Sequence, residues 1–394
     1  MNILLLAPHP FYQERGTPIA VDLLLRVLSG RGDTVDVVTF HEGTDKTYRG
    51  VTIHRLSALA WVRNIPPGFS WKKAVCDIFF MFKAFRLAAR NKYDLIHAVE
   101  EAAFMAMLIR VFYRIPYVFD MDSSIPMQLV EKTPALGIIA PFLRFFETLA
   151  ARQATAVVAV CEALADIARQ AGARNVFVLP DISLLSMDFS SAATTPAIPL
   201  DVERPCLMYI GNLEPYQGID LLLESFALAL QSLPRAFLAI IGGNDRAIQR
   251  YRDKCAALGI AERVRFYGPR PLSSMARLFA EADVLVSPRV KGINTPMKIY
   301  SYLQSGKPIL ATDLPTHTQV LDRATALLAA PNPGEFSAAM LHLLHNPGVG
   351  RQLAGRAAVL AEEKYGFKAY TETAEKIYRR IEANLSGPSA INKI

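Results

Sequence analysis

The segment 288–298 combines basic side chains with the signals of a helix start. Thr295 and Pro296 predict a helix N-terminus, because threonine caps helices and proline suits the first helical position. Lys298, three residues after Thr295, opposes the helix dipole unless an anion lies nearby. Gly292 would let that anion approach the backbone. The segment therefore predicts a diphosphate site, with a solvated basic loop as the alternative. The candidate ligands are Arg289, Lys291, Asn294, Thr295 and Lys298.

Glycines follow three further predicted strands, at the ends where parallel sheets bind ligands. Gly16 precedes a predicted helix whose Thr17 is a good N-cap, so its loop would offer N–H donors to an anion. A plain turn that requires positive φ at Gly16 is the alternative. Gly211 and Gly243 end two strands of the second half, and their loops would line one rim of a sheet.

The elements that position these loops alternate between short apolar runs and amphipathic stretches, as parallel strands and crossover helices do. In the first half we expect strands at 2–6, 34–39, 93–97, 116–120, 155–160 and 175–179. The expected helices cover 18–30, 71–91, 100–112, 138–153 and 162–172. This pattern predicts a doubly wound α/β sheet.

The alternation starts again after 186–205, a stretch rich in Ser, Thr, Ala and Pro that we interpret as a linker. Expected strands follow at 206–211, 237–241, 264–268, 283–287, 308–312 and 326–330. The expected helices are 217–232, 245–258, 272–281 and 296–304. We therefore expect two doubly wound, Rossmann-like domains, 1–190 and 205–365, which face each other across a cleft. A last helix at 366–387 should pack back toward the first domain.

Composition narrows the class of protein. The 394 residues are 52% hydrophobic, which is ordinary for a globular chain and long enough for two domains. With 43 Lys and Arg against 36 Asp and Glu, the net charge of +7 favours anionic partners. The basic residues are dispersed and no recognised motif is present, which disfavours a nucleic-acid-binding protein. Four scattered cysteines indicate neither a disulfide framework nor a metal site.

No signal peptide or long apolar run is evident at the N-terminus or elsewhere. We expect a cytoplasmic protein, or one attached to the inner face of a membrane. Residues 71–90 and 134–152 mix aromatic and basic side chains. They are either surface helices that rest on an anionic bilayer, or ordinary helices whose phenylalanines lie in the core.

Four motifs follow one another in the second half: YIGNLEPYQGIDLLLESF, LAIIGGN, VRFYGPRPLSSMARLFAEADVLVSP and NTPMKIYSYLQSGKPILATDLPTHTQVL. Their order and spacing resemble the donor domain of the retaining GT-B glycosyltransferases of family 4. The first half is similar more loosely, through DLIHA and PYVFD. The resemblance implies a GT-B fold in which the second domain binds a UDP- or GDP-sugar and the first binds the acceptor.

The resemblance also implies roles for particular donor-domain residues. Arg270 matches the family's base-contacting position, and the Gly211 loop would meet the diphosphate. The family's two cations in that loop fall on Asn212 and Gln217, which carry no charge. The second of the family's two glutamates, which holds the ribose, falls on Ser301. Lys298 and Arg289 would have to replace the missing cations.

In the first domain the family's histidine aligns with Asp122. His97 and Glu100 lie at the neighbouring predicted strand end, so all three are candidate catalytic groups, or else structural hydrogen-bonding residues. The implied chemistry is a front-face displacement in which the leaving diphosphate helps to deprotonate the acceptor. It needs neither a metal nor a cofactor.

Three functions fit these expectations. The first is a glycosyltransferase that acts on a glycan or lipid-linked acceptor in cell-surface polysaccharide or glycolipid biosynthesis. The second, suggested by the missing cations and glutamates, is a non-catalytic GT-B subunit that scaffolds a partner. The third is a GT-B sugar-nucleotide epimerase.

Overall fold

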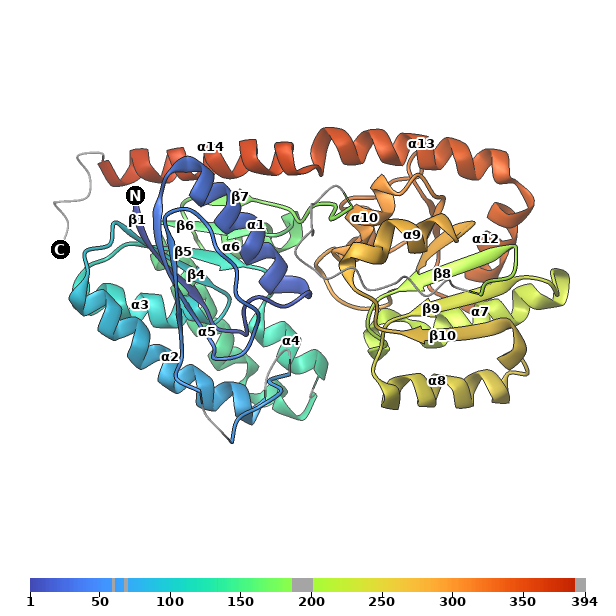
Figure 1. The fold of residues 1–394 in the computed structure, drawn as a ribbon, viewed down its shortest axis with the longest axis horizontal. Helices are drawn as coiled ribbons and strands as arrows, with labels where there is room; N and C mark the ends of the chain where they lie inside the picture. The colour runs from blue at the N-terminus through green and yellow to red at the C-terminus, as the bar shows by residue number, and fades with distance from the viewer. Residues whose placement is uncertain (59–60, 67–69, 133, 186–200, 387–394) are drawn as a thin grey trace. The chain divides into compact units, whose positions relative to one another are not determined.

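The computed structural model describes residues 1–58, 61–66, 70–132, 134–185 and 201–386 (Figure 1). Most of the predicted linker, at 186–200, therefore lies outside the described residues. The chain forms two compact units. The first comprises Met1–Pro180 and the C-terminal segment from Thr371, and the second comprises Asp181–Tyr370.

The first unit is built on seven parallel strands in the order β3-β2-β1-β4-β5-β6-β7. Its strands are β1 (Asn2–Ala7), β2 (Thr34–Thr39), β3 (Val51–Arg55), β4 (Leu95–Val99), β5 (Tyr117–Met121), β6 (Ala156–Ala159) and β7 (Val176–Val178). Its helices are α1 (Gly16–Arg31), α2 (Trp71–Arg90), α3 (Ala102–Tyr113), α4 (Ile125–Lys132), η1 (Pro134–Ile139), α5 (Ala140–Gln153), α6 (Glu162–Gln170) and, from Thr371 on, α14 (Phe367–Ser386).

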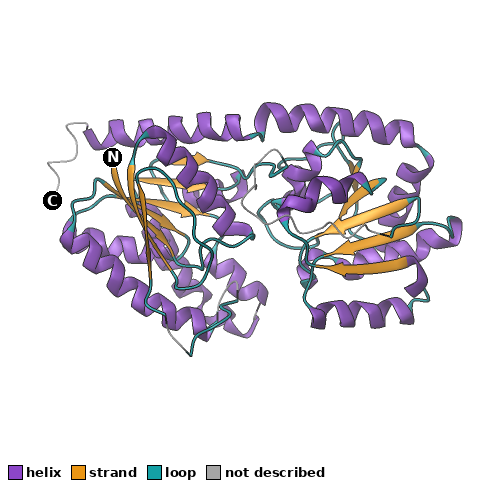
Figure 2. Cartoon of the chain, in the orientation of Figure 1, coloured by secondary structure: helices purple, strands orange, loops and turns teal. Residues whose placement is uncertain are grey.

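The second unit has six parallel strands in the order β10-β9-β8-β11-β12-β13, between helices (Figure 2). Its strands are β8 (Cys206–Ile210), β9 (Phe237–Ile241), β10 (Val264–Gly268), β11 (Val284–Ser287), β12 (Ile309–Thr312) and β13 (Leu327–Ala329). Its helices are η2 (Pro215–Gln217), α7 (Ile219–Ser232), α8 (Asp245–Ala257), η3 (Ala261–Arg263), η4 (Leu272–Ser274), α9 (Met275–Ala280), α10 (Lys298–Gln304), α11 (Pro315–Thr318), α12 (Pro333–His345) and α13 (Pro347–Lys364).

Both sheets confirm the predicted doubly wound α/β fold. In each, the strand order reverses beside the first strand, between β1 and β4 in one unit and between β8 and β11 in the other. Ligands of such sheets bind outside the carboxyl ends of the strands at this switch point. The loops after β8 and β11 are those that carry the predicted diphosphate ligands.

Several elements were not expected from the sequence, among them β3, α4, α11, α12 and α13. β3 is a half-exposed edge strand in which Thr52 and His54 interrupt the apolar residues, so it gives no apolar run. α13 begins with Pro347, Gly348 and Gly350, which are poor helix formers that obscure its pattern.

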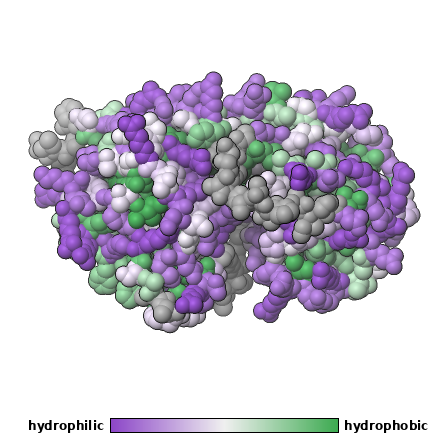
Figure 3. All heavy atoms as spheres, in the orientation of Figure 1, coloured by the Kyte–Doolittle hydropathy of each residue, from purple (hydrophilic) through white to green (hydrophobic). Residues whose placement is uncertain are grey.

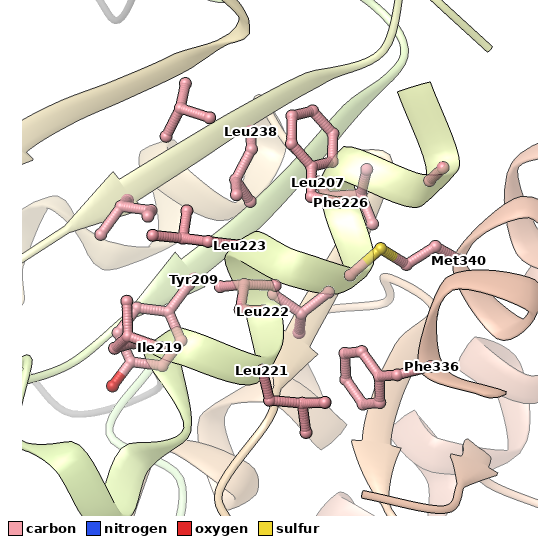
Figure 4. Close-up of a cluster of buried hydrophobic side chains, with 14 of the residues drawn as sticks. Leu207, Tyr209, Ile219, Leu221, Leu222, Leu223, Phe226, Leu238, Phe336 and Met340 are labelled. Atoms are coloured by element: carbon pink, nitrogen blue, oxygen red, sulfur yellow. The ribbon is translucent and has the colours of Figure 1, made fainter. Parts of the chain in front are cut away.

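The core of the second unit fixes the sheet that carries these loops. Figure 4 shows Leu222 and Phe226 of α7 packed with Leu207 and Leu238 of the sheet and with Phe336 of α12. Burial of each such side chain contributes about 1.5–3 kcal/mol. The strand ends of the switch point are therefore held by a rigid layer.

No helix within the described part of the chain is both long and apolar enough to cross a membrane.

Candidate functional site

Two loops of the second unit meet at the switch point between β8 and β11. The N–H group of Val290 donates a hydrogen bond to the carbonyl oxygen of Tyr216 at 3.0 Å. This bond joins the loop after β11 to the loop after β8. The predicted diphosphate ligands Gln217, Arg289 and Lys298 come from these loops or from the helix that follows.

The ammonium group of Lys298 lies against the loop after β8. Its Nζ donates to Oε1 of Gln217 at 3.2 Å and lies 3.9 Å from the ring centroid of Tyr209. A Cβ at Gly211, whose φ is +152°, would lie 3.3 Å from this Nζ and 2.8 Å from the Tyr209 hydroxyl. Glycine is therefore required at position 211, and the structure brings Gly211, Gln217 and Lys298 together.

The charge of Lys298 is held in an unfavourable environment. Burial, and to a smaller degree the like charge of Arg289, lowers the pKa of Lys298 well below its usual value. No salt bridge to Lys298 is present among the residues that the structure describes. A buried cation of this kind is stabilised by an anion that arrives with a ligand.

Arg289 organises the loop after β11. Its Nε donates to the carbonyl oxygen of Lys291 at 2.7 Å, and its Nη2 donates to Oδ1 of Asn294 at 2.9 Å. A Cβ at Gly292, whose φ is +100°, would lie 2.1 Å from Nη2. The loop therefore wraps around the side chain of Arg289, a residue that is only 7% exposed.

Side chains of residues 312–319, which we call the loop clamp, hold the backbone of the same loop. The Thr312 hydroxyl donates to the carbonyl oxygen of Arg289 at 2.5 Å, and the Thr316 hydroxyl donates to that of Asn294 at 2.8 Å. Nε2 of Gln319 donates to the carbonyl oxygen of Ile293 at 2.7 Å. Three backbone carbonyl groups of the loop are thus held by side chains of one neighbouring segment.

A buried histidine anchors the loop clamp. Nδ1 of His317 lies 3.0 Å from the carbonyl oxygen of Thr312, and Nε2 lies 2.9 Å from the Ser287 hydroxyl. Burial, together with the nearby positive charges of Lys298 and Arg289, lowers the pKa of His317 to about 3. The imidazole is therefore neutral, with Nδ1–H as the donor and Nε2 as the acceptor.

Two helix starts differ from the prediction. α10 begins at Lys298, and Thr295 does not cap it; the Thr295 hydroxyl lies 3.4 Å from Nε2 of Gln319 instead. α1 begins at Gly16, with Arg15 as N-cap and no capping side chain, so the predicted cap at Thr17 is wrong. Gly16 does not have positive φ, which contradicts the alternative of a strained turn.

The remaining predicted donor ligands are described by their own contacts and exposure. The Ser301 hydroxyl is buried and accepts a hydrogen bond from the N–H of Leu184 at 3.2 Å. Asn212 folds onto its own loop, where Nδ2 donates to the Tyr216 hydroxyl at 3.3 Å. Arg270 follows the edge strand β10, and its guanidinium donates to the carbonyl oxygen of Pro269. The side chain of Lys291 is exposed. Gly243 packs against Leu213.

In the first unit, Glu100 and Asp122 follow the neighbouring strands β4 and β5. Glu100 has φ of +51°, and its Oε1 accepts a hydrogen bond from the Ser123 hydroxyl at 2.8 Å. Burial raises the pKa of Glu100, because the charged carboxylate loses hydration. These two carboxyl groups stand at the carboxyl edge of the sheet.

His97 does not lie at the strand end, contrary to the prediction. It lies within β4, is 1% exposed, and places Nε2 3.0 Å from Oδ2 of Asp120. Its Nδ1 lies 2.8 Å from the hydroxyl of Tyr378 in α14. His97 therefore joins α14 to the sheet and is shielded from solvent.

Sequence reasoning missed several residues of these sites. Tyr209 and His317 lie inside regular elements, where an aromatic or a lone histidine is usually structural, so no local signal marks them. Lys73 of α2 donates to the carbonyl oxygen of Pro8 at 2.9 Å and pairs with Glu101. The basic residues of α2 had suggested only a surface role.

Family models match both halves of the chain. Residues 204–346 match the model of the glycosyl transferases group 1, and residues 15–181 match the model of the glycosyl transferase 4-like domain. A sulfoquinovosyl transferase of Arabidopsis thaliana is 23% identical over 382 residues, which cover 93% of this chain and 71% of that protein.

Solved structures share the fold. Sucrose-phosphate synthase from Thermosynechococcus elongatus gives a TM-score of 0.78 at 19% identity, over 97% of this chain and 99% of that one. The Anabaena protein HepE in complex with UDP-glucose gives a TM-score of 0.71 at 18% identity, over 96% of this chain and 100% of that one. At this identity the likeness establishes the GT-B fold alone.

Proposed function

Because the chain belongs to the glycosyltransferase family, we propose that it transfers a sugar, with retention of configuration, from a nucleoside diphosphate sugar to a glycan or lipid-linked acceptor. The second unit would bind the donor and the first unit the acceptor. The corresponding process is the synthesis of a cell-surface polysaccharide or glycolipid.

The observation that carries this proposal is the convergence of Lys298 and Arg289 at the switch point of the second unit. Arg289 is buried and Lys298 is half-buried, and the like charge of Arg289 contributes to the lowered pKa of Lys298. A diphosphate would bring two or more negative charges to this point and relieve that repulsion. This supports a donor whose leaving group is a diphosphate.

The reaction that we propose is the front-face displacement implied by the family resemblance. The bond between the anomeric carbon and the diphosphate oxygen breaks, and the acceptor oxygen bonds to the same face of that carbon. The departing diphosphate oxygen accepts the acceptor's proton. Lys298 and Arg289 would stabilise the negative charge that develops on the diphosphate, which is the main electrostatic contribution expected of the protein.

The acceptor side rests on Glu100 and Asp122. Glu100 follows β4, which flanks the switch point of the first sheet, and Asp122 follows β5, the next strand in the sheet. Carboxylates at this edge are suited to accept hydrogen bonds from sugar hydroxyls. His97 is proposed as a positioning residue for α14, because both of its ring nitrogens already have partners.

Binding of UDP and of GDP to the purified chain, measured by calorimetry, tests the donor site. We expect one of the two to bind, with affinity that falls in the Arg289→Met variant. Binding of neither nucleotide would refute the proposal. Hydrolysis or transfer of a radiolabelled sugar from the nucleotide that binds then tests catalysis.

One observation favours a second candidate, a non-catalytic subunit. Ser301 occupies the place of the family's ribose-binding glutamate, and its hydroxyl is engaged by Leu184. Asn212 and Gln217 likewise leave the loop after β8 without charge. Nucleotide binding without any turnover or hydrolysis would favour this candidate, and turnover by the isolated chain would exclude it.

A further inference from the structure

The first unit exposes an unusual number of aromatic side chains on α2. Phe79 and Phe82 are 47% and 65% exposed, although either could have been a core residue by sequence. Trp71, at the start of α2, is 59% exposed and stacks on Trp61 with ring centroids 6.2 Å apart. The interpretation that the phenylalanines of this segment lie in the core is therefore wrong for these two.

α3 and α5 continue this surface. Phe112 and Tyr113 of α3 are exposed, and both rings contact Phe85 of α2, with centroids 6.0 and 6.2 Å apart. Phe142 and Phe145 of α5 are also exposed. α3 in turn packs on α5, where Arg110 donates to the carbonyl oxygen of Gln153. We call the exposed side of α2, α3 and α5 the aromatic face.

The aromatic face is confined to one unit. Among the described residues, every exposed Phe, Tyr or Trp side chain belongs to the first unit. The exposed large hydrophobic residues of the second unit are three aliphatic ones, Leu228, Val349 and Val359. Figure 3 shows green and pale hydrophobic residues at its lower left, over the region that Figure 1 draws as α2.

The charges of the aromatic face have one sign. The exposed charged side chains of α2, α3 and α5 are all arginines: Arg86, Arg90, Arg110, Arg144 and Arg152. The acidic residues of these helices are Asp77 and Glu147. Asp77 pairs with Lys73 at 3.4 Å, and Glu147 is buried, where it accepts hydrogen bonds from Ser124 and Ile125. The described part of the face therefore presents no exposed carboxylate.

We propose that the aromatic face docks on an anionic lipid bilayer and holds the first unit against it. Phenylalanine and tryptophan insert at the boundary between headgroups and acyl chains, while arginines pair with the phosphates of anionic lipids. Tryptophans such as Trp61 and Trp71 are enriched at this boundary because their rings are amphipathic. An anionic membrane explains why every exposed charge on these three helices is cationic, whereas a protein partner would not require this.

This docking would bring the acceptor unit to a lipid-linked acceptor, but its test does not depend on donor binding. The full chain is sedimented, without nucleotide, with vesicles of phosphatidylcholine alone or of phosphatidylcholine mixed with phosphatidylglycerol. We expect binding to the mixed vesicles only, with loss of binding as salt is raised. Binding to neither vesicle would overturn the proposal.

Paired variants separate the two parts of the face. Phe79→Ser with Phe82→Ser removes apolar anchors, and Arg86→Glu with Arg144→Glu reverses charge. Each pair should lower the vesicle partition coefficient by about tenfold or more. Leu228→Ser with Val359→Ser, which changes exposed apolar residues of the second unit, is the matched control and should bind as the parent chain does.

We expect each variant to remain folded, because all of these side chains are exposed. Melting temperatures check this. Equal losses in the control pair, or unchanged binding after charge reversal, would refute the proposal. Sedimentation velocity tests the rival occupant, a second copy of the chain. A dimer that is disrupted by the Phe79 and Phe82 substitutions, together with no vesicle binding, would assign the face to self-association instead.

Discussion

At the scale of single residues, the buried ammonium of Lys298 links nucleotide affinity to the stability of the free protein. Burial lowers the pKa of Lys298 because the charged form loses hydration, and no carboxylate pairs with it among the described residues. We expect Lys298→Met to weaken UDP or GDP binding by about 10- to 100-fold, as loss of a charge-assisted hydrogen bond does. The same variant should be more stable without ligand, by about 1 kcal/mol or more.

Calorimetry and urea unfolding measure the two effects. The control is Arg351→Met, which removes an exposed cation of α13 in the same unit. It should change both quantities little, because exposed charges are screened by solvent. A Lys298→Met protein that binds nucleotide as the parent does would place the diphosphate elsewhere.

The lowered pKa of Lys298 also predicts opposite pH dependences for stability and for affinity. Between the lowered pKa in the folded chain and the ordinary value of 10.5, the unfolded chain binds more protons at this residue. The stability of the free protein therefore rises with pH in that window. Nucleotide affinity falls over the same window, because the ammonium that faces the diphosphate is lost. Both trends, taken as differences from Lys298→Met, are measured by unfolding and calorimetry as a function of pH. A difference that is flat with pH would contradict the assignment.

Local chemistry identified Gly211 and Lys298 from the sequence, because a glycine at a strand end and a lysine at a helix start are locally unusual. Gln217 was named only through the resemblance to the family's loop. It could not identify Tyr209, whose ring lies beneath the Lys298 ammonium, or His317. Their roles arise only from tertiary contacts between elements that are distant in the sequence. For His97 the prediction was wrong for the same reason. The sequence placed it at a strand end, but it lies within β4 and is covered by α14.

At the scale of elements, the loop clamp explains why the start of α10 was wrongly predicted. The capping rule considers Thr295 and its own helix, whereas Thr316 and Gln319 bind the backbone of Asn294 and Ile293 from another segment. These contacts determine the path of the loop before α10 begins at Lys298. Tertiary hydrogen bonds thus outweighed a local preference of about 1 kcal/mol.

We expect residues of the loop clamp to affect donor affinity, although they are not proposed to contact the donor. Thr316→Val with Gln319→Ala removes two hydrogen bonds to the loop, so the loop samples more conformations and pre-organises Arg289 less well. We expect nucleotide affinity to fall by about 3- to 30-fold, or about 0.7–2 kcal/mol. Two hydrogen bonds contribute about 0.5–1.5 kcal/mol each, and only part of that loss reaches the bound nucleotide. Thr318→Val, an exposed residue of the same short helix, is the matched control. Calorimetry on the two variants decides, and equal affinities would contradict a positioning role.

At the scale of the whole molecule, the chain returns to its first unit after completing the second. The doubly wound order of both sheets followed from alternating apolar and amphipathic segments, and it is confirmed by the strand order. We also expected the last helix to pack back toward the first domain, although no periodicity reveals which core an amphipathic helix covers. In the structure, α14 buries Ala374, Ile377, Tyr378 and Ile381 within the first unit, and its Glu382 pairs with Arg31 at 2.9 Å.

Removal of this segment should therefore destabilise one unit and spare the other. A chain that ends after Tyr370 loses three large apolar side chains from the first core, each worth about 1.5–3 kcal/mol, against a typical domain stability of about 5–15 kcal/mol. It also leaves the buried Nδ1 of His97 without the Tyr378 hydroxyl. Hydrogen exchange should show lost protection of β1 and β4, while the second unit keeps its protection and its nucleotide affinity. A chain that ends after Ser386 retains these contacts and should behave as the full chain does. Loss of nucleotide binding in the shorter chain would show instead that the second unit depends on α14.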